Sequence, residues 1–254
     1  PSRGLGDVYK RQDLIMLFRG EGMCSPKVTP GTAAAFAGLT PSLRKFRIPA
    51  ECASDGPSGI RMDCGTKAFS LPNGTLLGCT FNCELVRQLY EMTGLELRLN
   101  RVDTLLGPGL NIHRNPLCGR NFEYMSEDPH LTGRIAAPLV QGIQSQDVAA
   151  CVKHFALNNQ ECDRLSVDTK VDDKTLFELY LPAFYDALME GGSYSVMGAY
   201  NKYDGEFCCE NATLLKKILR DLWHYDGVTI SDWGGVHNLS LIHISEPTRR
   251  SYIS

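Results

Sequence analysis

The sequence lacks any apolar run approaching the roughly 18 consecutive residues that a membrane-spanning helix needs. It also lacks a strong excess of charge, because 26 Lys and Arg residues stand against 29 Asp and Glu residues, a net charge of −3. No basic stripe is present, so neither nucleic acid nor a membrane is expected as a partner. With 254 residues, 43% of them hydrophobic, the chain is long enough to bury one large core.

The ten cysteines follow no metal-binding or disulfide framework. They are scattered along the chain without the C-x-x-C spacing or the spaced histidines that a zinc site requires. We therefore expect no metal, and no other cofactor is indicated. Scattered thiols are more typical of a reducing cytosol than of a disulfide scaffold, so a cytoplasmic location is expected.

The two ends of the chain differ from the rest of the sequence. Residues 1–12 contain DVYKRQ, and residues 239–254 begin with LSLIHISEPTR, and both resemble the translation of a transposon-type sequencing adapter. We therefore expect only residues 13–238 to be native and the natural gene to extend beyond them. Within 13–238 there is no internal repeat and no low-complexity linker, so one domain is the simplest interpretation.

Four segments show the spacing of amphipathic helices. In 128–144, apolar residues recur four apart from Leu131 to Leu139, and Asp128 is a typical helix-capping residue. A second helix is expected over 83–93, ended by Gly94. The remaining helical segments are 174–189 and 212–223.

Short strand-like runs alternate with these helices. They are 46–50, 103–106, 148–152, 193–197 and 228–230. The repeated order of strand, loop and helix favours parallel β/α units. The expected fold class is α/β, a (β/α)8 barrel of the TIM type that is incomplete at both its C-terminal and its N-terminal end.

Polar residues follow the ends of the expected strands. Asp55 follows the first strand, Lys153 and His154 follow the third, Tyr200 follows the fourth and Asp232 follows the fifth. In a β/α barrel the carboxyl ends of the strands and the following loops converge on the face that holds the active site. These side chains, far apart in sequence, are therefore expected to line one pocket.

Five segments resemble glycoside hydrolase family 3, of the β-glucosidase type. They are DGPSGIR (55–61), GPGLNIHRNPLCGRNFEYMSEDP (107–129), KHFALNNQE (153–161), SVMGAYN (195–201) and TISDWGGVH (229–237). Their order and spacing match the family across residues 46–238. The resemblance implies an N-terminal barrel domain, and hydrolysis of terminal β-D-glucosidic bonds in a glucoside or oligosaccharide by a retaining double displacement.

The resemblance gives Asp232 the role of the catalytic nucleophile. A carboxylate is required there to attack the anomeric carbon and form a covalent glycosyl-enzyme. The carboxylate must be ionised, and cations such as Lys153 and Arg120 should favour that state. Taken alone, Asp232 could instead cap the next helix.

The resemblance also implies a set of sugar-binding residues around Asp232. They are Asp55, Arg120, Lys153, His154, Arg164, Met197, Tyr200 and Trp233. The carboxylate in this set suits two hydroxyls at the far edge of the sugar, and the cations and imidazole suit the other ring hydroxyls.

Some of these residues have plausible structural roles as well. Met197 could be plain core, Trp233 could pack under the barrel rim, and Arg164 could form a solvated salt bridge. Tyr200 is expected to hydrogen-bond the nucleophile. Glu127 is a candidate acidic partner for the cations.

Of the two catalytic carboxyl groups that the resemblance implies, the acid/base has no candidate in the sequence. A retaining glycosidase needs two carboxyl groups about 5–5.5 Å apart, one acting as nucleophile and one as acid/base. The family usually takes its acid/base glutamate from a second, α/β sandwich domain. We therefore expect that glutamate on a missing C-terminal domain, and this chain to be inactive alone. The alternatives are a β-xylosidase or α-L-arabinosidase of the same family, and a non-catalytic sugar-binding barrel.

Overall fold

The computed structural model of the chain describes Leu17 and residues 19–238. The segments 1–12 and 239–254, expected to derive from an adapter, lie outside the described residues. The strands are β1 (Ala34–Ala37), β2 (Ala50–Asp55), β3 (Thr104–Leu106), β4 (Ala149–Phe155), β5 (Asp168–Thr169), β6 (Ser195–Gly198), β7 (Lys202–Tyr203), β8 (Glu206–Phe207) and β9 (Val228–Ser231). The helices are α3 (Pro41–Lys45), α4 (Gly74–Cys79), α5 (Cys83–Leu99), η1 (Asn121–Glu123), α6 (Pro129–Gln144), α7 (Asp173–Thr175), η2 (Leu176–Tyr180), α8 (Pro182–Tyr185), η3 (Asp186–Glu190), η4 (Cys208–Glu210) and η5 (Thr213–Leu222).

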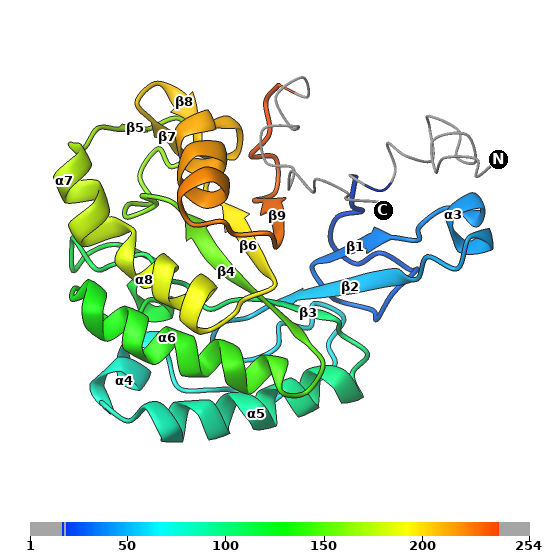
Figure 1. The fold of residues 1–254 in the computed structure, drawn as a ribbon. Coiled ribbons are helices and arrows are strands. Elements are labelled where there is room, and N and C mark those ends of the chain that lie inside the picture. The colour runs from blue at the N-terminus through cyan, green and yellow to red at the C-terminus, as the bar shows by residue number, and fades with distance from the viewer. Residues whose placement is uncertain (1–16, 18, 239–254) are drawn as a thin grey trace, which may run out of the picture.

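A curled six-stranded sheet forms the centre of the fold (Figure 1). Its order is β1-β2-β3-β4-β6-β9, in which β2 to β9 run parallel and β1 pairs antiparallel with β2. Within the described residues the outer strands β1 and β9 do not pair with each other, so the sheet is an open part of an α/β barrel. The predicted fold class is confirmed, although the antiparallel strand β1 was not foreseen.

Helices α5 and α6 pack against each other along one side of the sheet. Helix α6 begins as predicted, and the Asp128 carboxylate accepts a hydrogen bond from the backbone N–H of His130 at 2.8 Å. Helix α5, however, does not end at Gly94 but continues to Leu99. A Cβ at Gly94 would lie 2.8 Å from the carbonyl oxygen of Ile143, so this glycine allows α6 to approach closely.

The two later helical segments differ in regularity. Residues 174–189 divide into α7, the π-helix η2, α8 and the π-helix η3, with Pro182 starting α8. The segment 212–223 forms the π-helix η5, and the Asn211 side chain caps it by accepting from the N–H of Leu214 at 3.0 Å. None of the described helices is long and apolar enough to cross a bilayer.

Two of the predicted strands differ from the structure by three residues or more. The run 46–50 is not the first strand, because Arg47 has a positive φ of 62° and Pro49 has no N–H to donate. The strand β2 starts instead at Ala50 and ends on Asp55 itself. Strand β4 extends three residues beyond 152, so Lys153 and His154 lie inside it rather than after it.

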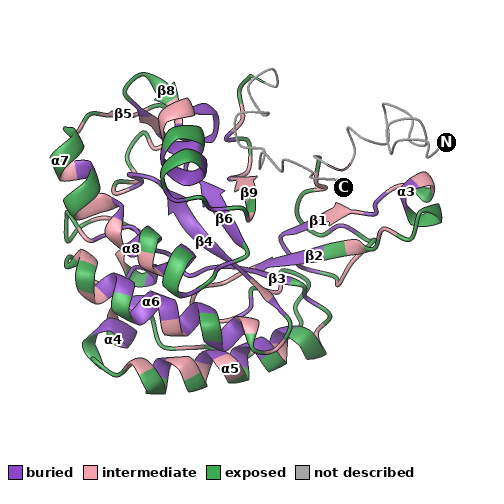
Figure 2. Cartoon of the chain, viewed as in Figure 1, coloured by how far each residue is buried: buried purple, intermediate pink, exposed green. Residues whose placement is uncertain are grey.

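The main core lies between the sheet and the helices, where buried segments face one another (Figure 2). The Phe155 ring meets Phe184 and Trp223 edge-to-face, with centroid distances of 5.2 and 6.0 Å. A smaller buried cluster around Met197 and Leu106 includes side chains from five strands of the sheet. The carboxyl ends of the parallel strands are therefore fixed from both sides.

All ten cysteines are described and are free thiols, and the cytoplasmic location stays a prediction.

Candidate active site

A cavity of about 580 Å³ opens at the carboxyl ends of the parallel strands. All nine residues proposed from the sequence line it: Asp55, Arg120, Lys153, His154, Arg164, Met197, Tyr200, Asp232 and Trp233. Strands β2, β4, β6 and β9 deliver most of these side chains, or end just before them. The convergence of strand ends that the pattern implied is therefore present in the structure.

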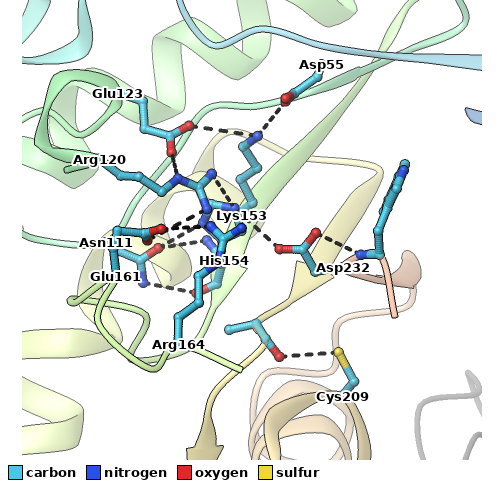
Figure 3. A network of polar contacts seen from close by, with 12 residues as sticks. Asp55, Asn111, Arg120, Glu123, Lys153, His154, Glu161, Arg164, Cys209 and Asp232 are labelled. Carbon is cyan, nitrogen blue, oxygen red and sulfur yellow. Dashed lines mark hydrogen bonds and ion pairs between the residues drawn. The ribbon is translucent and has the colours of Figure 1, made fainter. Parts of the chain in front are cut away.

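Lys153 is the buried cation at the centre of the polar network (Figure 3). Its Nζ lies 2.6 Å from Oδ1 of Asp55 and 3.8 Å from Oε2 of Glu123, while only 3% of the residue is exposed. Burial by itself would raise the pKa of Asp55, but the charge and the hydrogen bond of Lys153 bring that pKa below its ordinary value. Asp55 is therefore an ionised acceptor at the cavity wall.

Glu123 joins this lysine to Arg120. Its carboxylate accepts a hydrogen bond from Nε of Arg120 and is itself only 4% exposed. The sequence had suggested Glu127 for this place, but Glu127 is exposed and forms no ion pair with another described residue. The acid that balances the two cations is thus Glu123.

His154 is held in one tautomer by its neighbours. Nη2 of Arg120 lies 2.9 Å from Nε2 of His154, and because a guanidinium only donates, Nε2 must accept. Nδ1 then carries the proton, 3.3 Å from Oδ1 of Asn111 and 3.3 Å from the hydroxyl of Tyr124. Burial, followed by the charges of Arg120 and Lys153, places the pKa of His154 well below its ordinary value, so the ring is neutral.

Asp232 directly follows β9 and is 8% exposed. Its Oδ1 accepts from the backbone N–H of Trp233 at 2.8 Å, whereas Oδ2 has no hydrogen-bond partner among the described residues. Burial raises the pKa of Asp232 above its ordinary value, against the opposing effects of the Trp233 amide and Lys153. The cations favour the ionised form as expected, but burial outweighs them.

Tyr200 and Arg164 lie in two loops and line the same cavity as Asp232. Burial and the Asp232 charge raise the pKa of Tyr200, and the Tyr200 hydroxyl in turn lowers that of Asp232. The two side chains are therefore close, but no described residue lies at hydrogen-bond distance from Oδ2 of Asp232, so the expected hydrogen bond from Tyr200 stays a prediction. The Arg164 guanidinium lies 5.0 Å from the centroid of the Tyr200 ring and 2.8 Å from Glu161. Arg164 thus forms a salt bridge and lines the cavity as well.

Met197 and Trp233 both line the cavity and also make structural contacts. Met197 is 2% exposed and belongs to the small inner cluster, yet it also lines the cavity. The Trp233 indole Nε1 donates to the carbonyl oxygen of Ala33 at 3.3 Å, which ties the loop after β9 to the segment before β1.

The family model described as "Glycosyl hydrolase family 3 N terminal domain" matches residues 18–251, most of the chain. The chain belongs to glycoside hydrolase family 3. A β-glucosidase of Ruminococcus albus is 54% identical over 221 residues, which are 87% of this chain and 23% of that protein. The chain thus spans about a quarter of that relative's length.

Two solved structures of family 3 proteins share the fold. A β-glucosidase from Paenibacillus barengoltzii is 49% identical with a TM-score of 0.89, over 94% of this chain and 26% of that one. β-Glucosidase 3B from Thermotoga neapolitana, solved in complex with glucose, is 40% identical with a TM-score of 0.84, over 89% of this chain and 33% of that one.

Three polar residues of this family 3 site were missed in the sequence. Asn111 and Glu123 both lie inside the motif 107–129, and Glu161 ends the motif 153–161. Asn111 holds the His154 backbone, accepting from its N–H at 2.9 Å and donating to its carbonyl at 3.0 Å. The sequence signal that could have identified them was their position inside motifs that match the family. Among the described residues, no group of three or more His, Cys, Asp or Glu side chains could hold a metal.

Proposed function

We propose that the protein to which this chain belongs hydrolyses terminal β-D-glucosidic bonds with retention of configuration, and that Asp232 is its nucleophile. Asp232 carries the proposal because it differs from the other carboxylates that line the cavity. Asp55 and Glu123 are paired with Lys153, and Asp63 is paired with Arg61 at 2.9 Å. Asp232 retains one oxygen, Oδ2, to which no group in the described part of the chain is hydrogen-bonded.

The surrounding residues suit the ring of a bound sugar. Asp55 accepts hydroxyl hydrogens, while Lys153 and Arg120 only donate, so together they complement vicinal hydroxyls. The Asp232 carboxylate then attacks the anomeric carbon, and the bond to the leaving-group oxygen breaks as the glycosyl ester forms. Water attacks the same carbon in the second step, releases Asp232 and restores the original configuration.

Among the described residues that line this cavity, no carboxyl group is a candidate for the proton donor to the leaving group. The lining carboxylates named above other than Asp232 are paired with cations, which suits acceptors rather than a proton donor, and the pairing with Lys153 lowers the pKa of Asp55. We propose that the acid/base glutamate comes from outside the described residues, on a C-terminal α/β sandwich domain, with residues 13–238 as the native barrel part. The greater length of the relatives supports this arrangement.

The relatives at 54% and 49% identity are named as β-glucosidases, which favours glucosides. Two relatives at 40% identity are named as exo-α-(1→6)-L-arabinopyranosidases, so an α-L-arabinopyranoside belongs in the test beside the β-xyloside. The test compares leaving groups on the 254-residue chain. Without the acid/base glutamate the chain should be inactive on an alkyl β-glucoside, as expected for the chain alone. A 2,4-dinitrophenyl β-D-glucoside needs no proton donor to depart, so it is the exception that the chain should still cleave. The matching xyloside and α-L-arabinopyranoside should react more slowly.

Asp232→Ala should lower the cleavage of the activated glucoside by roughly 10³-fold or more. Azide offers a further check, because it can replace water in attacking the glycosyl-enzyme without base assistance. It should accelerate turnover and give β-glucosyl azide. Turnover that survives Asp232→Ala, or an α-glucosyl azide product, would overturn the proposal.

A further inference from the structure

The position of the Asp232 carboxylate depends on the backbone of the loop that follows it, residues 232–238. Oδ1 of Asp232 accepts from the N–H of Trp233, and the Asp232 carbonyl accepts from the N–H of Gly235 at 2.8 Å. Any shift of this loop therefore moves the carboxylate relative to the sugar.

Glu210 holds the far end of this loop. Its Oε1 accepts hydrogen bonds from the backbone N–H groups of both His237 and Asn238. The side chain sits on the short helix η4 and is only 7% exposed. Because one buried carboxyl oxygen accepts from two successive amides, Glu210 fixes both peptide groups at the same point.

A stack of side chains reinforces the same point of the loop. The Phe207 and His237 rings lie parallel, with a centroid distance of 3.7 Å and an interplanar angle of 22°. The Lys202 ammonium also lies over the Phe207 ring, 4.7 Å from the ring centroid. Strands β7 and β8 thus hold the loop through His237.

Cys209 fills the space between the loop and the end of β6. Its Sγ donates to the carbonyl oxygen of Ala199 at 3.4 Å, the contact visible below Asp232 in Figure 3. A Cβ on Gly198 would lie 2.8 Å from this sulfur, and one on Gly235 would lie 3.0 Å from it. The thiol therefore sets the spacing between the strand that precedes Tyr200 and the loop that carries Asp232.

We propose that residues 207–210 form an anchor that positions the Asp232 carboxylate for attack, with Glu210 as its principal positioning residue. Neither Glu210 nor Cys209 lines the cavity, so both act through the loop and not on the sugar. The inference rests on the proposed role of Asp232 as nucleophile. It adds a specific demand: loosening the loop must slow the chemical step more than it weakens sugar binding.

The test measures how fast Asp232 is glycosylated in the 254-residue chain. With 2,4-dinitrophenyl 2-deoxy-2-fluoro-β-D-glucoside, the rate constant for labelling reports attack, and the half-saturating concentration reports binding. Glu210→Ala should lower the rate constant at least tenfold and change the half-saturating concentration less than twofold. Glu210→Gln, which keeps an acceptor oxygen, should recover most of the loss. Phe207→Ala should give a smaller loss.

Asp128→Ala is the matched control. Asp128 also accepts from two backbone N–H groups, those of His130 and Leu131, but it caps α6 and does not line the cavity. Its removal should lower thermal stability and leave the labelling rate constant of the folded protein unchanged. A similar loss of rate in Asp128→Ala and Glu210→Ala would reduce Glu210 to a merely structural role and overturn the inference.

Amide hydrogen exchange tests the anchor independently of any reaction. Glu210→Ala should speed exchange across residues 233–238 at least tenfold, and Glu210→Gln should not. Unchanged exchange in Glu210→Ala overturns the anchor whatever the labelling shows. Failure of the parent chain to label Asp232 would instead overturn the proposed function. Labelling of Glu210→Ala at the parent rate would overturn only the positioning role.

Discussion

Nε2 of His154 lies 3.8 Å from Oδ2 of Asp232, yet the two do not form a charged pair. The imidazole is buried beside Arg120 and Lys153, which lower its pKa, and its Nε2 already accepts from Arg120. The positive charge near Asp232 therefore comes from the lysine and arginine side chains. The histidine supplies a fixed neutral ring.

The first prediction concerns the protonation of His154. Its ring should stay neutral from pH 8 down to at least pH 6, as the Nδ1–H tautomer, because burial and two nearby cations oppose a further charge. ¹⁵N NMR of the histidine rings, with His154→Asn to assign the signal, checks this. Titration near 6.5, or a proton on Nε2, would contradict the assignment.

Asp232 should cost the folded state stability at neutral pH. Folding raises the pKa of the Asp232 carboxyl above its unfolded-state value of 3.8. The carboxyl therefore stabilises the folded state fully at pH values below 3.8, and this stabilisation is lost as the pH rises through the folded-state pKa. Asp232→Asn should therefore melt higher than the parent at pH 7 and equally at pH 3.5. Thermal melts across this range measure the difference, and a lower melting temperature at pH 7 would count against the burial cost.

For Asp55, in the same cavity, the dependence of stability on pH has the opposite sign. Its pKa is lowered by Lys153, so its contribution is present above 3.8 and is lost as pH falls through the folded pKa. Asp55→Asn should destabilise the fold by about 1–2 kcal/mol at pH 7, since Asp55 is partly exposed and Glu123 still faces the lysine. That corresponds to roughly 2–4 °C per kcal/mol in melting temperature. A neutral or stabilising effect would show that the pair contributes nothing to folding.

Gly94 separates two opposing expectations. Helix propensity alone predicts that Gly94→Ala stabilises α5 by about 0.5–1 kcal/mol. The 2.8 Å approach of a Cβ to the Ile143 carbonyl predicts the reverse, a loss of about 1–3 kcal/mol, because α6 would have to move. Urea unfolding distinguishes the two. Gln88→Ala, at an exposed position of the same helix, is the control and should change stability by less than about 0.5 kcal/mol.

Much of the site could be predicted because the sequence motifs lie at the carboxyl ends of the expected strands. Asp55 ends β2, Lys153 lies near the carboxyl end of β4 and Asp232 directly follows β9, and parallel strands bring such positions to one edge. The strand β2 was harder to place, since its residues AECASD are small or polar and contain little of the apolar signal of a buried strand.

The partners of the cations required the tertiary structure. Sequence spacing could not choose between Glu123 and Glu127, because which of them faces Lys153 depends on the turn of η1 after Arg120. Gly94 was likewise misjudged, since a glycine that ends a helix and one that admits a neighbouring helix look alike in sequence. The raised pKa of Asp232 was also missed, because burial depends on the surrounding fold.

The most direct test of the account is to identify the side chain that becomes glycosylated. The 254-residue chain is incubated with 2,4-dinitrophenyl 2-deoxy-2-fluoro-β-D-glucoside, digested with protease and sequenced by mass spectrometry. The account predicts one stable 2-deoxy-2-fluoroglucosyl ester, on Asp232 and absent from Asp232→Asn. A label on another residue, or no label at saturating reagent on folded protein, would contradict it.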